Sequence, residues 1–180
     1  THLKVLCTVL AALVFSACSD DAKKAKSLER ADGLFAAGDL DAAKIEYLNV
    51  LKVSPGNDRA IERLGLIWYD QGATIEALPY LVESDKRNPE LQEVGMRVAR
   101  AYISIGRIPE ARIKVLDLLG RSPLHEEAFL MLASTSMTEE ELEETEEHLE
   151  RLKESNGASY HLVRAVLLLK REDQAGAEKA

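Results

Sequence analysis

Large apolar residues recur along this chain at a fixed step of 34 residues, together with a glycine, an alanine and a proline that keep the same step. The four columns are Leu34, Trp68 and Tyr102; Gly38, Gly72 and Gly106; Ala43, Ala77 and Ala111; and Pro55, Pro89 and Pro123. A fixed period between about 20 and 50 residues is typical of stacked repeat arrays, and a period of 34 is that of a helix–turn–helix unit. The pattern therefore predicts an all-α array of repeated helix pairs.

Each unit needs two helices of about 13 residues, and the four columns provide the turns and the seam between them. A glycine just after the first helix can adopt a positive φ, and a proline after the second helix prevents its continuation. The small alanine lets the two helices approach closely, and stacked neighbours bury the apolar stripe that one pair alone cannot. The large residues expected to fill the seam are Tyr47, Val50, Leu51, Leu64, Trp68, Leu81, Val98, Tyr102, Val115 and Leu118.

The second and third units carry the spacing of a known repeat family. The matching residues are Leu64, Gly65, Trp68, Gly72, Ala77, Leu81 and Pro89, followed by Val98, Ala99, Tyr102, Gly106, Ala111, Val115 and Pro123. At these residues the chain resembles the tetratricopeptide repeat (TPR) family, and the resemblance implies a right-handed α-α superhelix. It places repeats at about 24–57, 58–91, 92–125 and 126–157, within an array over 27–157.

Several segments depart from that pattern. The fourth unit lacks the glycine and the alanine, and Pro79 falls about one turn into a second helix, which we expect it to bend. Thr138 and Glu141 have the spacing of a capping box at the start of the fourth unit's second helix. A strongly apolar first helix of a fifth unit begins near Ala158, so we expect residues 158–180 to form an incomplete repeat that ends inside its second helix.

The first residues read as an export signal. Lys4 precedes an eleven-residue apolar run, 5–15, broken only by Thr8, and this run is too short to cross a bilayer as a helix. The small residues that lead into Cys18 resemble a bacterial lipobox. That resemblance implies a signal peptide over 1–17, a lipid on Cys18 and a polar tether over 18–26. The alternatives are a plain secretory signal cut before Cys18 and an uncleaved anchor.

The cysteines agree with lipid attachment. Cys7 lies within the apolar run and would be removed with it, so Cys18 would be the only thiol of the mature chain and could form no internal disulfide. In the lipoprotein family, an aspartate directly after the lipidated cysteine tends to retain the protein at the inner membrane. Ser19 stands at that position here. We therefore expect a protein that faces the periplasm, in the inner leaflet of the outer membrane rather than in the inner membrane.

Charge and motifs exclude several functions. The chain has 23 Lys and Arg against 31 Asp and Glu, a net charge of −8, which disfavours nucleic acid as a partner. It contains no phosphate-binding loop, nucleophile elbow or zinc-protease motif. The glutamate run over 139–154 follows a helix face and has no calcium-loop glycine, so it reads as a solvated surface. We therefore predict no enzyme activity, no catalytic residue, no cofactor, no metal and no small-molecule substrate.

Partner binding is the remaining function, because in the TPR family the first helices line a concave groove. Transferred to this chain, that face combines an apolar ridge (Phe35, Leu66, Tyr69, Met96 and Ile103) with charges of both signs, which suits an extended peptide or an amphipathic helix. The carboxylate clamp of some relatives is disfavoured, since Leu28 and Asp32 replace its Lys and Asn and only Arg97 matches. Trp68 and Tyr102 read as core residues. The predicted groove residues are Phe35, Arg59, Glu62, Tyr69, Asp70, Met96 and Arg100.

Together these features predict an adaptor that is lipid-anchored in the bacterial envelope. Its partners would be envelope proteins held in the TPR groove, and its role would be assembly of a secretion, pilus or polysaccharide-export system. The lipobox leading straight into repeats is similar to the repeat lipoproteins associated with exopolysaccharide and PEP-CTERM sorting systems. Two alternatives stay open: the targeting arm of a longer enzyme, and a glycan- or cell-wall-binding module.

Overall fold

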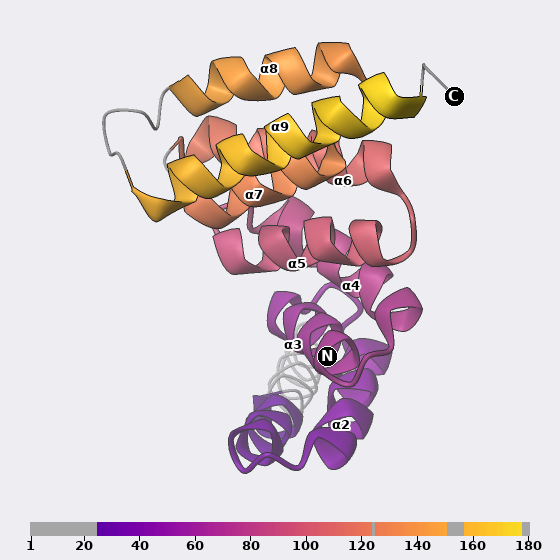
Figure 1. Ribbon diagram of the computed structural model, residues 1–180. Coiled ribbons are helices and arrows are strands. Elements are labelled where there is room, and N and C mark those ends of the chain that lie inside the picture. Colours follow the sequence, from indigo (N-terminus) through magenta and orange to yellow (C-terminus); the bar gives the residue numbers. More distant parts are fainter. Residues whose placement is uncertain (1–24, 124, 151–156, 178–180) are drawn as a thin grey trace, which may run out of the picture. The chain divides into compact units, whose positions relative to one another are not determined.

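The computed structural model describes residues 25–123, 125–150 and 157–177, and all of their regular structure is helical (Figure 1). The predicted all-α repeat fold is therefore confirmed. The chain divides into two compact units, the first extending to Arg87 and the second beginning at Asn88. The predicted signal peptide, the lipidation site Cys18 and most of the tether lie outside the described residues. Residues 25 and 26, which were assigned to the tether, already belong to the first helix.

The first unit consists of two helix pairs. Its helices span residues 25–36, α2 (Leu40–Val53), α3 (Asp58–Asp70) and α4 (Thr74–Arg87). The core of this unit contains Tyr47, Leu64 and Ile67, all fully buried, with Trp68 and Phe35 partly buried against it. Pro79 lies inside α4, which continues through it. The bend expected there stays a prediction.

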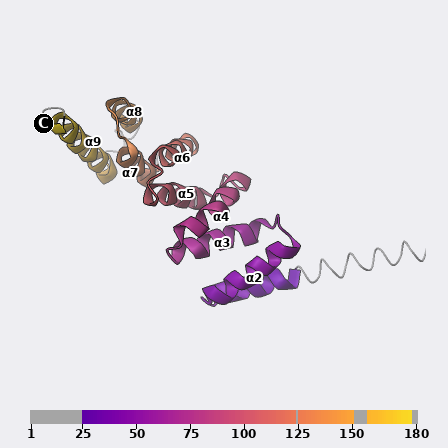
Figure 2. The ribbon, with the colours of Figure 1, turned by 90° about the vertical axis from the view of Figure 1, so that its right-hand side faces the viewer.

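The second unit contains α5 (Gln92–Ser104), α6 (Ile108–Arg121), α7 (Glu126–Thr135), α8 (Glu139–Glu150) and α9 (Ala158–Ala177). Within this unit α9 packs against both α7 and α8 (Figure 2). Phe129, Leu132 and Leu142 are buried at its centre. Among the described residues, no helix combines the length and the apolar character needed to cross a bilayer.

The three glycines of the repeat column end the first helix of their pairs in the same way. Gly38, Gly72 and Gly106 have φ of 79°, 77° and 77°. The residue that follows each glycine donates its amide N–H to the carbonyl of the large residue four positions before the glycine. After Gly72, for example, the Ala73 amide donates to the Trp68 carbonyl at 2.9 Å. This is the Schellman motif, which explains why the large residue and the glycine keep a constant separation.

The alanine column lies in the packed seam of each helix pair. Ala43, Ala77 and Ala111 are completely buried, as the sequence predicted. The two helices of the second pair approach closely at Gly65 in α3, where a Cβ would lie 3.0 Å from both the backbone nitrogen and Cδ2 of Leu81 in α4. The absence of a side chain at Gly65 therefore sets the distance between α3 and α4.

The fourth pair has a different turn. Glu140 stands at the glycine position of the column, and α7 ends at Thr135, so it has 10 residues where α3 and α5 have 13 each. The capping box is confirmed: Thr138 Oγ1 accepts from the Glu141 amide at 3.2 Å, and the Glu141 carboxylate accepts from the Thr138 amide at 3.1 Å. In the other pairs a positive-φ glycine makes the turn between the two helices. In the fourth pair the side-chain cap of Thr138 and Glu141 defines the start of α8 instead.

The last helix is longer than predicted. Residues 175–180 were expected to belong to a second helix, but α9 continues as one helix of 20 residues to Ala177. Gln174 stands where the column would place a turn glycine, and a residue with a Cβ disfavours the left-handed conformation that such a turn needs. The helix therefore runs past the position of the expected turn.

Candidate partner-binding surfaces

The first-helix face of unit 1 is organised around Asp32. One oxygen of its carboxylate, Oδ1, accepts from Tyr47 Oη at 2.7 Å and from Arg59 Nε at 2.9 Å. Burial, followed by the hydrogen bond to Asp32, raises the pKa of Tyr47 well above its usual range. Tyr47 therefore stays protonated and acts as a permanent donor, and Asp32 joins the first helix to α3 through Arg59.

Phe35, on the same face, is already engaged on two sides. The Arg63 guanidinium carbon lies 4.5 Å from the Phe35 ring centroid, a cation–π distance, and Tyr47 meets the ring edge-on with centroids 6.5 Å apart. The Glu62 carboxylate lies 4.0 Å from Arg63. A partner that approaches this face would therefore meet a cation over the ring rather than an open aromatic surface.

Trp68 packs against the core of unit 1, but it also contacts a cation that the sequence did not predict. The Lys44 ammonium of α2 lies 4.3 Å from the Trp68 ring centroid. Its position is fixed by hydrogen bonds to Asp41 at 3.0 Å and to Gln71 at 2.8 Å. In unit 2, the Arg107 guanidinium carbon lies 4.9 Å from the Tyr102 ring centroid. Both aromatic residues are therefore intramolecular cation–π platforms.

The first-helix face of unit 2 carries a run of ion pairs. Arg100 Nε of α5 donates to Glu127 of α7 at 2.9 Å. On the other side, Glu93 lies 3.4 Å from Arg97 and 4.0 Å from Arg100. The predicted binding residue Arg100 therefore also links two neighbouring first helices, with a third of its side chain (33%) still exposed.

The two units have ion pairs at equivalent positions of their repeats, but the order of acid and base is reversed: the acid comes first in unit 1 and the base comes first in unit 2. Asp32 and Arg59 are 27 residues apart, as are Arg100 and Glu127, and two repeat periods separate one pair from the other. Each pair joins the first helix of one repeat to the first helix of the next. Such partly exposed pairs contribute about 0–1 kcal/mol each, so their main effect is on which groups face a partner.

The predicted apolar ridge is wrong in part. Met96 is 1% exposed and belongs to the core of unit 2 with Phe129 and Leu132, so it cannot reach a partner. Its position was assigned from the family groove, whereas the α7 residues that stack beside it cover it. Leu66 is also buried, at 8% exposure. The other predicted groove residues keep exposed or half-exposed side chains: Phe35, Arg59, Glu62, Tyr69, Asp70 and Arg100.

A buried polar network in unit 2 was missed from the sequence. Arg112 of α6 is 6% exposed and donates to Ser136 Oγ at 2.9 Å and to the Glu141 carbonyl at 3.0 Å, and it also pairs with the Glu144 carboxylate. Thr145 Oγ1 lies 3.4 Å from the guanidinium and 2.9 Å from Ser136 Oγ. The charge is thus paired and hydrogen-bonded, as a buried charge must be.

The repeat columns contain the signal for this network. Arg112 stands two periods after Lys44, Ser136 one period after Tyr102, and Thr145 one period after Ala111. In unit 1 the Lys44 cation lies over the Trp68 ring, whereas the fourth repeat, in unit 2, has a serine in the aromatic column, so the Arg112 cation hydrogen-bonds instead. Two polar residues at otherwise apolar columns could have indicated a buried polar cluster.

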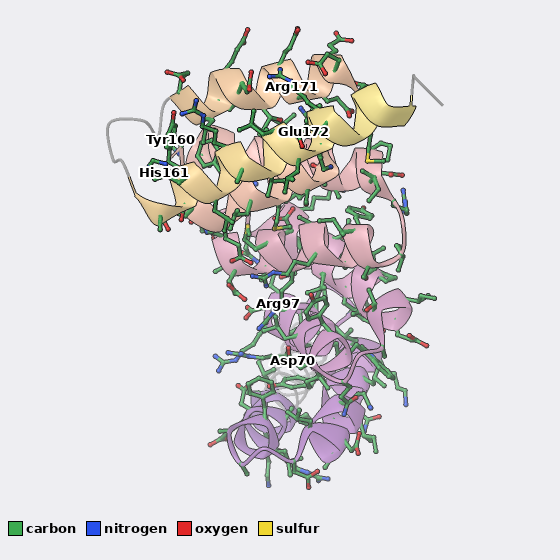
Figure 3. All side chains as sticks on the ribbon, viewed as in Figure 1. Asp70, Arg97, Tyr160, His161, Arg171 and Glu172 are labelled. Atoms are coloured by element: carbon green, nitrogen blue, oxygen red, sulfur yellow. The ribbon has the colours of Figure 1, made fainter. Side chains whose placement is uncertain are left out.

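The last helix is fixed to its neighbours by two cations. Lys170 Nζ donates to the carbonyls of Ser134 at 2.8 Å and Ser136 at 2.7 Å, which closes the end of α7. Burial lowers the pKa of Lys170 below its usual value. Arg171 of α9, which is labelled in Figure 3, donates to Glu139 at 2.9 Å and to Glu146 at 2.8 Å on α8. These contacts orient the faces of α9.

An acidic hollow of about 540 Å³ lies beside α8 and α9. Its lining residues are Glu143, Glu146, Glu147, Leu149, Glu150, Tyr160 and Arg164. Within the described part of the chain, no three His, Cys, Asp or Glu side chains converge to hold a metal ion. The negative lining repels phosphate groups, in keeping with the exclusion of nucleic acid on net charge.

The helix pairs, the Schellman turns and the stacked first helices define the fold of tetratricopeptide repeat proteins, and solved structures agree. A tetratricopeptide repeat protein from Parabacteroides merdae matches 87% of this chain with a TM-score of 0.69 and 20% identity, over 63% of its own length. MamA from strain AMB-1 matches 76% of this chain and 75% of its own with a TM-score of 0.64 and 24% identity. A further MamA structure gives 0.65 and 20%, covering 87% of this chain and 88% of its own.

The sequence itself matches no family model and no curated protein. At 20–24% identity, the structural likeness shows that the chain has the TPR fold. What the chain binds has to be argued from its own surface residues.

Proposed function

We propose that this chain is a non-enzymatic scaffold that binds other proteins through its first-helix faces. The observation that carries the proposal is the arrangement of those faces: stacked first helices that present fixed charges beside half-buried aromatic rings. Arg59 is 56% exposed although it is paired with Asp32, and Asp70 is exposed next to the half-exposed Tyr69. Fixed charges of both signs give register and specificity to a bound segment, and the half-exposed Tyr69 ring provides an anchor.

The structural neighbours support a protein partner rather than a substrate. Tetratricopeptide repeats form extended surfaces of stacked helices, a form that suits peptides and helices. The net charge of −8 disfavours nucleic acid as the partner, which supports the same conclusion. We propose an extended peptide or an amphipathic helix as the bound element.

We also propose that the scaffold is lipid-anchored through Cys18, in the inner leaflet of the outer membrane and facing the periplasm. The apolar run, the lipobox-like residues and the lone mature thiol support this proposal. The first described helix residue is 25, so the six residues 19–24 separate it from Cys18 and can span at most about 20 Å. Such a short connection would keep the repeats near the membrane and raise their effective concentration for partners there.

Assembly of a secretion, pilus or polysaccharide-export system is the role we propose for this scaffold. It rests on the likeness to exopolysaccharide-associated repeat lipoproteins and on the envelope location proposed above. A machine that spans the envelope needs factors that hold its subunits at one membrane surface. A tethered repeat array fits that need.

Site-specific photo-cross-linking in the full-length protein tests the binding face. A photoreactive amino acid at Tyr69 should cross-link to one defined envelope protein, and the yield should fall when Arg59 and Arg100 are changed to alanine. The matched control is the same probe at Ile75, which is 75% exposed on α4 in the same unit. Equal cross-linking from both positions, or an unchanged yield in the double variant, would contradict the proposal that the first-helix face binds the partner.

Lipid attachment is tested separately. Incorporation of labelled palmitate and recovery in the outer-membrane fraction are both expected for the unaltered chain, and both should be lost in Cys18→Ser. If Cys18→Ser stays membrane-bound and the unaltered chain takes up no label, the anchor proposal is wrong while the binding face is unaffected.

A further inference from the structure

The last helix has two apolar faces, and only one of them is covered within the described structure. Tyr160, Val163 and Leu167 are 7%, 0% and 0% exposed, because they pack into the core of unit 2. On the remaining surface of α9, Leu162 is 53% exposed and Leu169 is 62% exposed. At 3.6 residues per turn these two leucines align over two turns with Ala165 between them and Val166 at their edge.

The repeat columns show what kind of surface this is. The residues one, two and three periods before Leu162 are Ala128, Val94 and Ala60, and those before Leu169 are Thr135, Ala101 and Ile67. All six are at most 3% exposed. The same face of α3, α5 and α7 is thus part of the packed interior. The exposed face of α9 is therefore a helix-docking face, and its complement is a helix with an apolar stripe.

The geometry points to a second copy of this chain as the occupant, with α9 packing antiparallel against its own equivalent. This goes beyond the proposed scaffold function and does not depend on it. A two-fold axis between residues 165 and 166 places Leu162 of one copy beside Leu169 of the other, and Leu169 beside Leu162. Ala165 then faces Val166, and its small side chain permits the close approach that Ala43, Ala77 and Ala111 provide within the repeats.

Charge complementarity selects the antiparallel orientation. His161 and Glu172 are both exposed and lie on the same flank of the leucine stripe, near opposite ends of the helix segment (Figure 3). In an antiparallel pair the His161 ring of one copy comes within one helical turn of the Glu172 carboxylate of the other, where an imidazole N–H can donate to it. In a parallel pair, His161 of one copy and Glu172 of the other would lie 11 residues apart along the helix axis, so this contact could not form.

The apolar stripe formed by Leu162, Ala165, Val166 and Leu169 is short, so we expect a weak association. A pair of α9 helices would bury less than the roughly 1,200 Å² of a standard stable interface. We therefore expect a dissociation constant on the order of 10–100 µM.

Disulfide cross-linking in the full-length chain tests both the occupant and its orientation. With Cys7 and Cys18 replaced by serine, Ala165→Cys should give an oxidant-dependent homodimer in cells. Leu162→Cys and Leu169→Cys should each cross-link poorly alone but efficiently when differently tagged copies carrying one or the other are co-expressed. Ile45→Cys, at a position 58% exposed on α2, is the matched control for random collision.

Added charge on the stripe supplies the second measurement. Leu162→Asp together with Leu169→Asp should lower the Ala165→Cys dimer yield at least about tenfold, because each leucine withdrawn from an apolar contact weakens binding about tenfold or more. Both residues are exposed, so an unchanged circular dichroism spectrum is expected and would show intact folding. A dimer yield no greater than that of Ile45→Cys overturns the proposal. So does a product of heteromeric mass, which would assign the face to a different protein.

Discussion

The contact between Gly65 and Leu81 gives a stability prediction whose sign opposes intrinsic helix propensity. Gly65→Ala should destabilise the protein although alanine is the better helix former. The gain from propensity is about 1 kcal/mol. The new methyl group would lie 3.0 Å from the Leu81 backbone nitrogen and 3.1 Å from its Cγ, and the nitrogen cannot rotate away. Overpacking of this kind costs about 1–3 kcal/mol, so we expect a net loss of about 1 kcal/mol.

Gly33→Ala is the matched control in the same unit. Gly33 also lies inside a helix, and among the described residues nothing lies within 4 Å of the position of its Cβ. This variant should therefore gain about 0.5–1 kcal/mol from propensity alone. Urea unfolding followed by circular dichroism should separate the two variants by roughly 1 M in midpoint, given slopes of about 1–3 kcal/mol per molar.

The third repeat shows which second substitution should relieve the overpacking caused by Gly65→Ala. One period after Gly65 and Leu81, the chain has Ala99 and Val115, both fully buried. Gly65→Ala combined with Leu81→Val copies that pair, and should be more stable than the sum of the two single changes by about 0.5–1 kcal/mol. If Gly65→Ala instead stabilises the protein as much as Gly33→Ala does, the close approach of α3 and α4 does not limit the packing and the reasoning fails.

Three further predictions test the caps and charges of unit 2. Thr138→Ala should cost about 1 kcal/mol in urea unfolding, because the Glu141 amide loses its acceptor, whereas the exposed Glu140→Ala should have little effect. Arg112→Ala should cost about 2–3 kcal/mol, well above Arg107→Ala at a half-exposed position, and equal losses would contradict the buried network. Burial raises the pKa of Asp117, but hydrogen bonds from Lys114 and Arg121 outweigh it and hold that pKa below 3.8. The stability that Asp117 contributes is therefore present above pH 4 and lost as the pH falls through its folded pKa, so Asp117→Asn should show a smaller loss between pH 7 and pH 3.

The sequence allowed the fold to be predicted because each repeat column has a local physical cause. The positive φ at Gly72 and the complete burial of Ala77 depend on residues within one helix pair. The capping box of α8 was equally local, since its two members are three residues apart. Such features can be recognised in one sequence without knowledge of the neighbouring units.

The binding face was harder to predict because exposure depends on the neighbouring repeat. Met96 lies on a first helix, as the family pattern requires, but residues of α7 bury it. Arg100 was predicted to be a binding residue on position alone, and its pairing with Glu127 depends on a residue in the next repeat. Arg112 received no role, because the network that holds it combines residues from α6, α8 and the turn between α7 and α8.

The reversed ion pairs indicate how this chain distinguishes one repeat neighbour from another. Repeats with the same columns have similar stacking faces, so the wrong first helices could pack together during folding. In the native order Asp32 meets Arg59 and Arg100 meets Glu127. If α7 took the place of α3 beside the first helix, Asp32 would face Glu127. If α3 took the place of α7 beside α5, Arg100 would face Arg59. Each such error brings like charges together. The reversed order of acid and base in the two pairs therefore penalises incorrect stacking, although each pair contributes little to the stability of the native fold.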